Sequence, residues 1–147
     1  HLTGATGGST RITDMARRHR DEPYGPDLAR IAGEVQDELA TLRAVVRALD
    51  LGTHPAKRVL AWVGERLGSL KPNGRLVSGS PMTPVLELDL MRAAVNAKGA
   101  GWEVLEHYAG DLGLPSAPFS RLREQSQEQS DTLARAHSVA LATAFRR

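Results

Sequence analysis

The chain contains no cysteine, which excludes disulfide bonds, zinc–thiolate sites and a thiol nucleophile. Aromatic residues make up only 4% of its 147 residues, and no apolar run is long enough to cross a bilayer. The formal net charge is only +2, whereas nucleic-acid-binding domains usually carry a stronger and more clustered positive charge. These shortages predict a soluble cytoplasmic protein, and they count against a membrane or nucleic-acid partner.

Apolar residues recur at steps of three and four along most of the chain, which predicts an all-α protein. Residues 1–147 are expected to form one domain, because a chain of this length can bury a core of its own. The pattern predicts long helices over 1–20, 27–49, 84–112 and 117–145, and a short helix over 55–70. Proline and glycine lie in the predicted connections, where they interrupt helices.

The connection between the second and third long helices is long enough to run from one end of a bundle to the other. Four-helix bundles with one such crossover are ferritin-like. We therefore expect a ferritin-like four-helix bundle, with the short extra helix in this connection and its two middle long helices parallel. A plain up-down bundle with an extra helix is the alternative.

The segment Thr3-Gly4-Ala5-Thr6-Gly7 looks like the phosphate loop of nucleotide-binding Rossmann enzymes. That chemistry needs a buried strand before the glycines and βαβ units after them, and the sequence offers neither. We expect a helix here instead, in which Gly4 and Gly8 allow close contact with a neighbouring helix.

Glu87 and Lys98 project onto the apolar face of the helix predicted over 84–112. Buried charges are costly when they are alone, so each needs a partner. In the crossover layout, Glu38 lies at a height similar to that of Lys98, and the inner face of the last helix carries polar residues. We therefore predict a Glu38–Lys98 pair that is hydrogen-bonded to Gln129 or Ser130. The complete predicted polar network consists of Glu38, Glu87, Lys98, Gln129, Ser130 and His137.

A metal centre is the sharpest alternative for this interior. Ferritin-like di-iron proteins use one Glu on each of two helices and Glu-x-x-His on each of the other two. The sequence has no Glu-x-x-His, and Glu103, Glu106 and His107 project away from the core. Glu38 and Glu87 are the only remaining ligand candidates, and Lys98 brings a positive charge to where metals would lie. No catalytic residue, cofactor site or metal site is therefore predicted, with an iron or manganese site as the alternative.

The passages LKPNGRL at 70–76 and SPMTPVLEL at 80–88, followed by Lys98-Gly99 and Trp102, resemble an uncharacterised bacterial family of small helical proteins. The resemblance covers most of the chain, with Asp89 where a second Glu would be expected. It implies a ferritin-like bundle and no established activity.

Three functions follow from these features. The first, which we prefer, is a structural or interaction role without enzymatic activity, for a bundle that is a candidate homo-oligomer. The second is a ferritin-like metal-binding or oxidative protein with an altered site. The third is a regulatory module that binds an anion, nucleic acid or a partner helix through the basic residues of 17–20.

Overall fold

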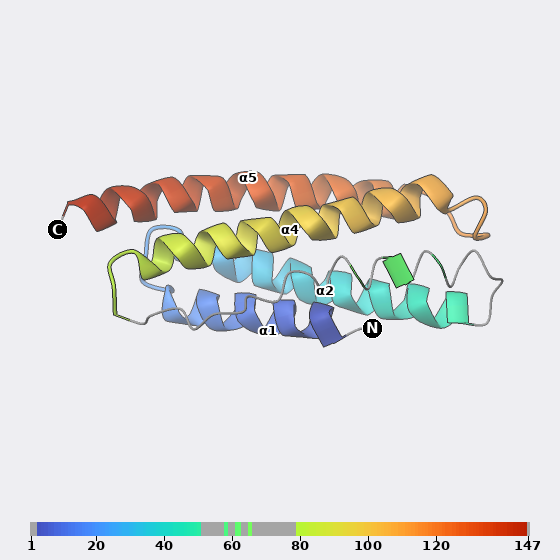
Figure 1. The fold of residues 1–147 in the computed structure, drawn as a ribbon, viewed down its shortest axis with the longest axis horizontal. Coiled ribbons are helices and arrows are strands. Elements are labelled where there is room, and N and C mark those ends of the chain that lie inside the picture. The colour runs from blue at the N-terminus through green and yellow to red at the C-terminus, as the bar shows by residue number, and fades with distance from the viewer. Residues whose placement is uncertain (1–2, 51–57, 59–60, 63–64, 66–78, 147) are drawn as a thin grey trace.

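The computed structural model describes residues 3–50, 58, 61–62, 65 and 79–146. Within these residues the chain contains helices and no strand (Figure 1), which confirms the all-α prediction. The long helices are α1 (Thr3–Arg18), α2 (Gly25–Asp50), α4 (Thr83–Tyr108) and α5 (Ala117–Phe145). All four long helices were predicted from the apolar spacing.

The largest error in the predicted helix ends lies between α4 and α5. Helix α4 ends at Tyr108 rather than at residue 112. Gly113 adopts a φ of 69°, a left-handed conformation that favours glycine, and the Leu114 amide donates to the Ala109 carbonyl at 2.8 Å. The helix was predicted to run up to Gly113, but the turn that contains this glycine already takes up residues 109–112.

Helix α1 includes the segment that looks like a phosphate loop. Residues 3–8 are helical, so the expected helix is present there. A Cβ added at Gly8 would meet nothing within 4 Å. The predicted close helix contact at Gly8 is therefore wrong, because that position does not face a neighbouring helix.

The helices are arranged as two antiparallel hairpins, α1 with α2 and α4 with α5 (Figure 1). The two hairpins meet where α1 packs on α4 and where α2 packs on α5. Helices α2 and α4 run in the same direction (Figure 1), as expected for a long crossover. They lie diagonally across the bundle, so only long side chains from these two helices can meet in its interior.

The short helix predicted over 55–70 falls mostly outside the described residues. Within that range the structure describes Arg58, Ala61, Trp62 and Glu65, all in helical conformation. The short helix therefore stays a prediction.

Buried apolar side chains form two clusters along the bundle. The first consists of Ile12, Met15, Tyr24, Leu28, Ile31, Ala32, Val85, Leu88, Met91, Val95, Leu133, Ala136 and Ala140. The second consists of Leu42, Val45, Leu49, Trp102, Leu105, Ala109 and Phe119. The level of Glu38 on α2, Lys98 on α4 and Gln129 on α5 lies between the two clusters.

A helix that crosses a bilayer must be long and predominantly apolar. Among them, no helix is both long enough and apolar enough to cross a bilayer.

Candidate functional site

A polar layer crosses the bundle between the two apolar clusters. It contains Glu38 from α2, Lys98 from α4 and Gln129 from α5. Glu38 is 3% exposed and Gln129 is fully buried. Three helices therefore bring buried polar side chains to one level of the interior, between the two apolar clusters.

The Lys98 ammonium group joins the three helices. Its Nζ atom donates hydrogen bonds to Glu38 Oε2 and to Gln129 Oε1, the second at 2.6 Å. The contact with Glu38 is also an ion pair that crosses the diagonal of the bundle. The structure thus brings together the pair predicted from the sequence, with Gln129 as the shared partner.

The Gln129 amide is fully used by charged neighbours. Its Nε2 atom donates to Glu38 Oε1 and to Glu34 Oε2, both at 2.9 Å, and its Oε1 atom accepts from Lys98. A carboxylate accepts hydrogen bonds and an ammonium donates them, so only one orientation of the amide satisfies all three partners.

The polar layer continues from the interior towards the protein surface. Glu34 accepts a hydrogen bond from Arg30 Nη1 at 2.7 Å, and Arg30 Nη2 donates to Thr132 Oγ1 at 3.4 Å. The Glu34 side chain is 22% exposed and the Arg30 side chain is 46% exposed. Two carboxylates of α2 are therefore matched by two cations, one inside the bundle and one at its edge.

Sequence reasoning missed Glu34 and Arg30 as parts of this layer. Residues four apart on a helix differ by only about 40° in direction, so Glu34 and Glu38 can reach the same amide. The four-residue spacing of Arg30, Glu34 and Glu38 was the available signal.

Burial controls the protonation of Lys98. Desolvation lowers the pKa of its ammonium group below the usual 10.5, while the charge and hydrogen bond of Glu38 oppose this change. Since burial is the larger effect, the charged form is less favoured here than in the unfolded chain.

The structure does not bring Glu87 into the polar layer. Glu87 accepts hydrogen bonds from Arg18 at 2.5 Å and contacts His19 Nε2 at 2.8 Å, at the end of α1. Glu87 and Lys98 share a helix face but lie eleven residues apart, which is about 16 Å along the axis. The predicted network is wrong for Glu87, because a shared face does not mean a shared level. This separation also removes Glu38 and Glu87 as a metal-ligand pair.

Ser130 and His137 are likewise absent from the layer. Ser130 is buried and accepts a hydrogen bond from Arg92 Nε at 3.4 Å. His137 Nε2 lies 3.2 Å from Asp89 Oδ1, at the edge between α4 and α5. Ser130 points about 100° away from Gln129 because the two are consecutive on a helix, and His137 is two turns further along.

A metal centre needs several ligand side chains close together. Across residues 3–50 and 79–146, and in the short described pieces between them, no group of three or more His, Cys, Asp or Glu side chains is placed to hold a metal ion. The interior oxygens of Glu38 and Gln129 instead surround the Lys98 ammonium.

An open groove of about 540 Å³ lies on the surface between α4 and α5. Its lining residues are Val95, Asn96, Gly99, Ala100, Glu103, Arg123, Glu124, Ser126, Gln127 and Glu128. A Cβ added at Gly99 would lie 3.2 Å from Ser126 Cβ, so the two helices approach closely beneath the groove. Arg123 in its wall donates to Glu106 at 2.7 Å.

No protein-family model, no curated protein and no solved structure matches the chain.

Proposed function

We propose that the chain is a ferritin-like bundle with a structural or interaction role, in which Lys98 replaces an interior metal ion. The observation that carries this proposal is the contact of its ammonium group with Glu38 and Gln129 inside the bundle. A buried carboxylate needs a compensating cation, and here a side chain of the same protein supplies it. The hydrogen bonds among Lys98, Glu38 and Gln129 then serve to hold α2, α4 and α5 together.

Two features support the ferritin-like part of the proposal. The first is the parallel direction of α2 and α4, which a long crossover produces. The second is the resemblance of 70–76 and 80–88 to a bacterial family of helical proteins. We place the protein in the reducing cytoplasm, the usual setting for a chain without cysteine.

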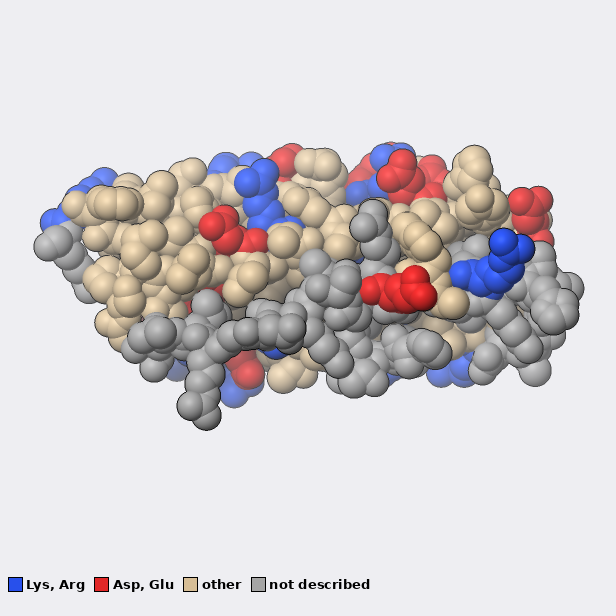
Figure 2. Space-filling model, in the orientation of Figure 1, with Lys and Arg blue, Asp and Glu red and all other residues tan. Residues whose placement is uncertain are grey.

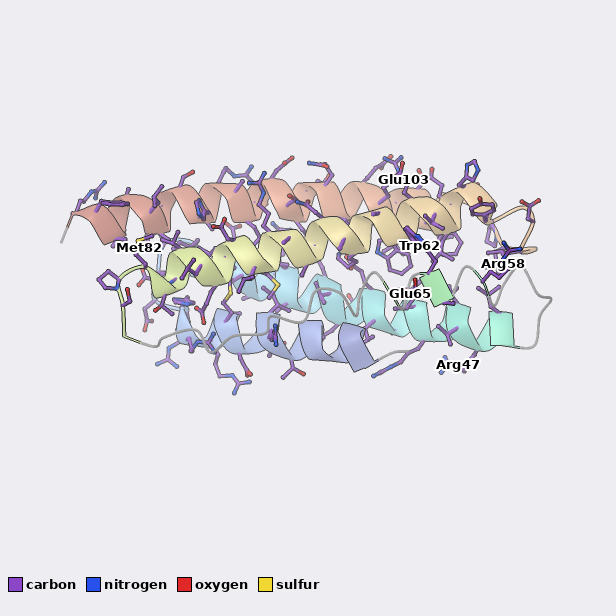
Figure 3. All side chains as sticks on the ribbon, viewed as in Figure 1. Arg47, Arg58, Trp62, Glu65, Met82 and Glu103 are labelled. Atoms are coloured by element: carbon purple, nitrogen blue, oxygen red, sulfur yellow. The ribbon has the colours of Figure 1, made fainter. Side chains whose placement is uncertain are left out.

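Exposed apolar side chains on α4 support an interaction role. Met82, Leu86 and Leu90 follow one another at steps of four and are 36%, 48% and 41% exposed, so they lie along one side of the helix. Figure 3 shows Met82 at the start of α4 and Glu103 near its other end. In Figure 2, few charged residues interrupt the surface over the first half of α4. Clustered exposed apolar side chains are typical of protein contact surfaces, and we propose self-association through this side.

The metal-free interior is tested by elemental analysis of the purified full chain. We expect far less than one equivalent of iron, manganese or zinc, and no thermal stabilisation on adding these ions. Stoichiometric metal that stabilises the protein would overturn the proposal for the interior.

Self-association is tested by sedimentation at increasing protein concentration. We expect a concentration-dependent dimer that the substitution Leu86→Glu weakens at least tenfold. Val139 on α5 is 40% exposed, so Val139→Glu is a matched control that should leave association unchanged. A monomer at every concentration would remove the self-association proposal.

A metal-binding or oxidative protein with an altered site is the second candidate. The observation that favours it is the convergence of Glu34 and Glu38 on one buried amide, since paired carboxylates are common metal ligands. The same elemental analysis separates the two candidates.

A further inference from the structure

The cation and the groups that hold it come from different helices. The ammonium group of Lys98 reaches the polar layer from α4, whereas the acceptor oxygens belong to Glu38 on α2 and Gln129 on α5. Glu34 adds a second negative charge that acts on the ammonium. Removing one side chain of α4 would therefore remove the cation and leave every acceptor.

The acceptors are also tied to one another without Lys98. Gln129 Nε2 holds Glu34 and Glu38 at 2.9 Å each, and Arg30 holds Glu34 at 2.7 Å. The Lys98 side chain is 17% exposed, so part of it reaches the surface, and shortening it would open a path from solvent towards the acceptors. The acceptors should keep their arrangement when the ammonium is absent, and a small solute can enter.

We propose that Glu38, Gln129 and Glu34 form a cation-binding cage, and that this cage binds a free primary alkylammonium ion once the side chain at position 98 is shortened. This inference rests on the proposed function, because it takes Lys98 to be the resident cation. It implies that a related chain with a small residue at this position would carry a binding site for a primary amine.

The contacts favour an alkylammonium ion over a divalent metal. One carboxylate oxygen and one amide oxygen contact Nζ, and these acceptors match the N–H donors of an ammonium group. Calcium needs six to eight oxygen ligands, and magnesium needs a near-ideal octahedron. The channel left by the Lys98 methylenes would hold a short alkyl chain.

The test uses the full chain with Lys98→Ala and n-propylammonium chloride as the probe, with sodium chloride at equal ionic strength as the salt control. At ten times its dissociation constant, the amine should raise the thermal midpoint by about 4 °C. Lys98→Met fills the same space without a charge and should show no saturable shift. Glu38→Gln combined with Lys98→Ala should also show none, because the carboxylate is lost.

Each result of this titration has one meaning. A saturable shift in Lys98→Ala alone supports the cage. Equal shifts in Lys98→Ala and the double variant, or no shift in either, overturn it. Stabilisation by manganese but not by propylammonium also overturns it, because the site would then be a metal site. If the wild-type protein is metal-free and propylammonium does not shift the thermal midpoint of Lys98→Ala, the cage proposal is wrong and the proposed function stands.

A second route applies if Lys98→Ala does not fold. The chain has no cysteine, so Lys98→Cys introduces a single thiol. In the unfolded protein, 2-bromoethylamine alkylates that thiol and restores a side chain of lysine length with a terminal ammonium. We expect this product to refold to a thermal midpoint near that of the wild type, whereas the uncharged product made with bromoethane should not. Equal midpoints for the two products would overturn the cage.

Discussion

Replacing Lys98 with methionine removes the interior cation and nearly preserves the side-chain volume. Glu38, which is 3% exposed, would then keep only the hydrogen bond from Gln129. Removing one partner of a buried ion pair costs about 3–5 kcal/mol. The Lys98 side chain is 17% exposed, so water can reach part of the site and we expect the lower end, about 3 kcal/mol.

The double substitution Glu38→Met with Lys98→Met distinguishes charge from packing. It removes the isolated carboxylate together with the cation, and replacing a buried pair with apolar residues is often neutral or stabilising. Gln129 Oε1 has lost its donor in both variants, so that cost cancels; in the double variant Gln129 Nε2 also loses Glu38 as an acceptor but keeps Glu34, which costs about 1 kcal/mol. We therefore expect the double variant to be about 2 kcal/mol more stable than Lys98→Met alone.

The assay is equilibrium urea unfolding followed by helical circular dichroism, with equal slopes required for all variants. Arg43 is an exposed residue of α2, so Arg43→Met is the control and should change the free energy of unfolding by less than about 0.5 kcal/mol. If the double variant is no more stable than Lys98→Met, the charge argument is wrong and Lys98 acts through its methylenes.

The pH dependence provides an independent check on the same residue. The folded-state pKa of Lys98 lies below 10.5, with burial as the main cause. Between that lowered pKa and 10.5 the unfolded chain binds more protons than the folded chain, so folding stability should rise with pH. The neutral amine can still donate to Glu38 and Gln129. The wild type should therefore gain stability relative to Lys98→Met as the pH approaches 10.5, and a loss over this window would contradict the assigned shift.

Three further predictions concern Tyr24, which precedes α2, and two glycines of this helix. Burial raises the pKa of Tyr24 to about 12, so in a Tyr108→Phe background its absorbance should titrate near that value. The folded pKa of Tyr24 exceeds the unfolded value of 10.0. The stability that Tyr24 contributes should therefore be complete below pH 10 and lost as the pH rises towards 12. An absorbance titration with a midpoint near pH 10 would contradict its burial. Gly25→Ala would place a Cβ 2.4 Å from the Arg20 carbonyl oxygen, so thermal unfolding should show a loss of about 1–3 kcal/mol. A Cβ added at Gly33, an exposed position of α2, would meet nothing within 4 Å, so Gly33→Ala should stabilise the protein by up to about 1 kcal/mol. If Gly33→Ala instead lost as much stability as Gly25→Ala, steric overlap would be ruled out as the cause of the loss at Gly25.

Apolar spacing was sufficient to predict the long helices and the level of one ion pair. The long connection predicted that α2 and α4 run in parallel, and counting residues from each helix start then placed Glu38 beside Lys98. Both steps use only the fixed rise and rotation of an α-helix. This is why the pair could be predicted without any knowledge of contacts.

The remaining site predictions failed because a shared helix face fixes only the direction in which two side chains point. Side chains that form one site must also lie at the same height along the bundle. Glu87 shares the direction of Lys98, yet it binds Arg18 and His19 near the first turn of α4. Gln129 and Ser130 share a level but differ in direction, so Ser130 contacts Arg92 instead. The end of α4 was predicted at the residue before Gly113, but the turn that contains this left-handed glycine begins four residues earlier, at Ala109.

The four-residue step between Glu34 and Glu38 has a consequence for how the two hairpins align. Sliding α4 and α5 by one helical turn, about 5.4 Å, would carry Lys98 from one carboxylate to the other. The ion pair would survive this slip, whereas the apolar clusters on either side would lose their matching layers. The Lys98 ion pair by itself therefore leaves two alignments open. The apolar side chains, together with the contacts of Glu87 with Arg18 and His19, select between them.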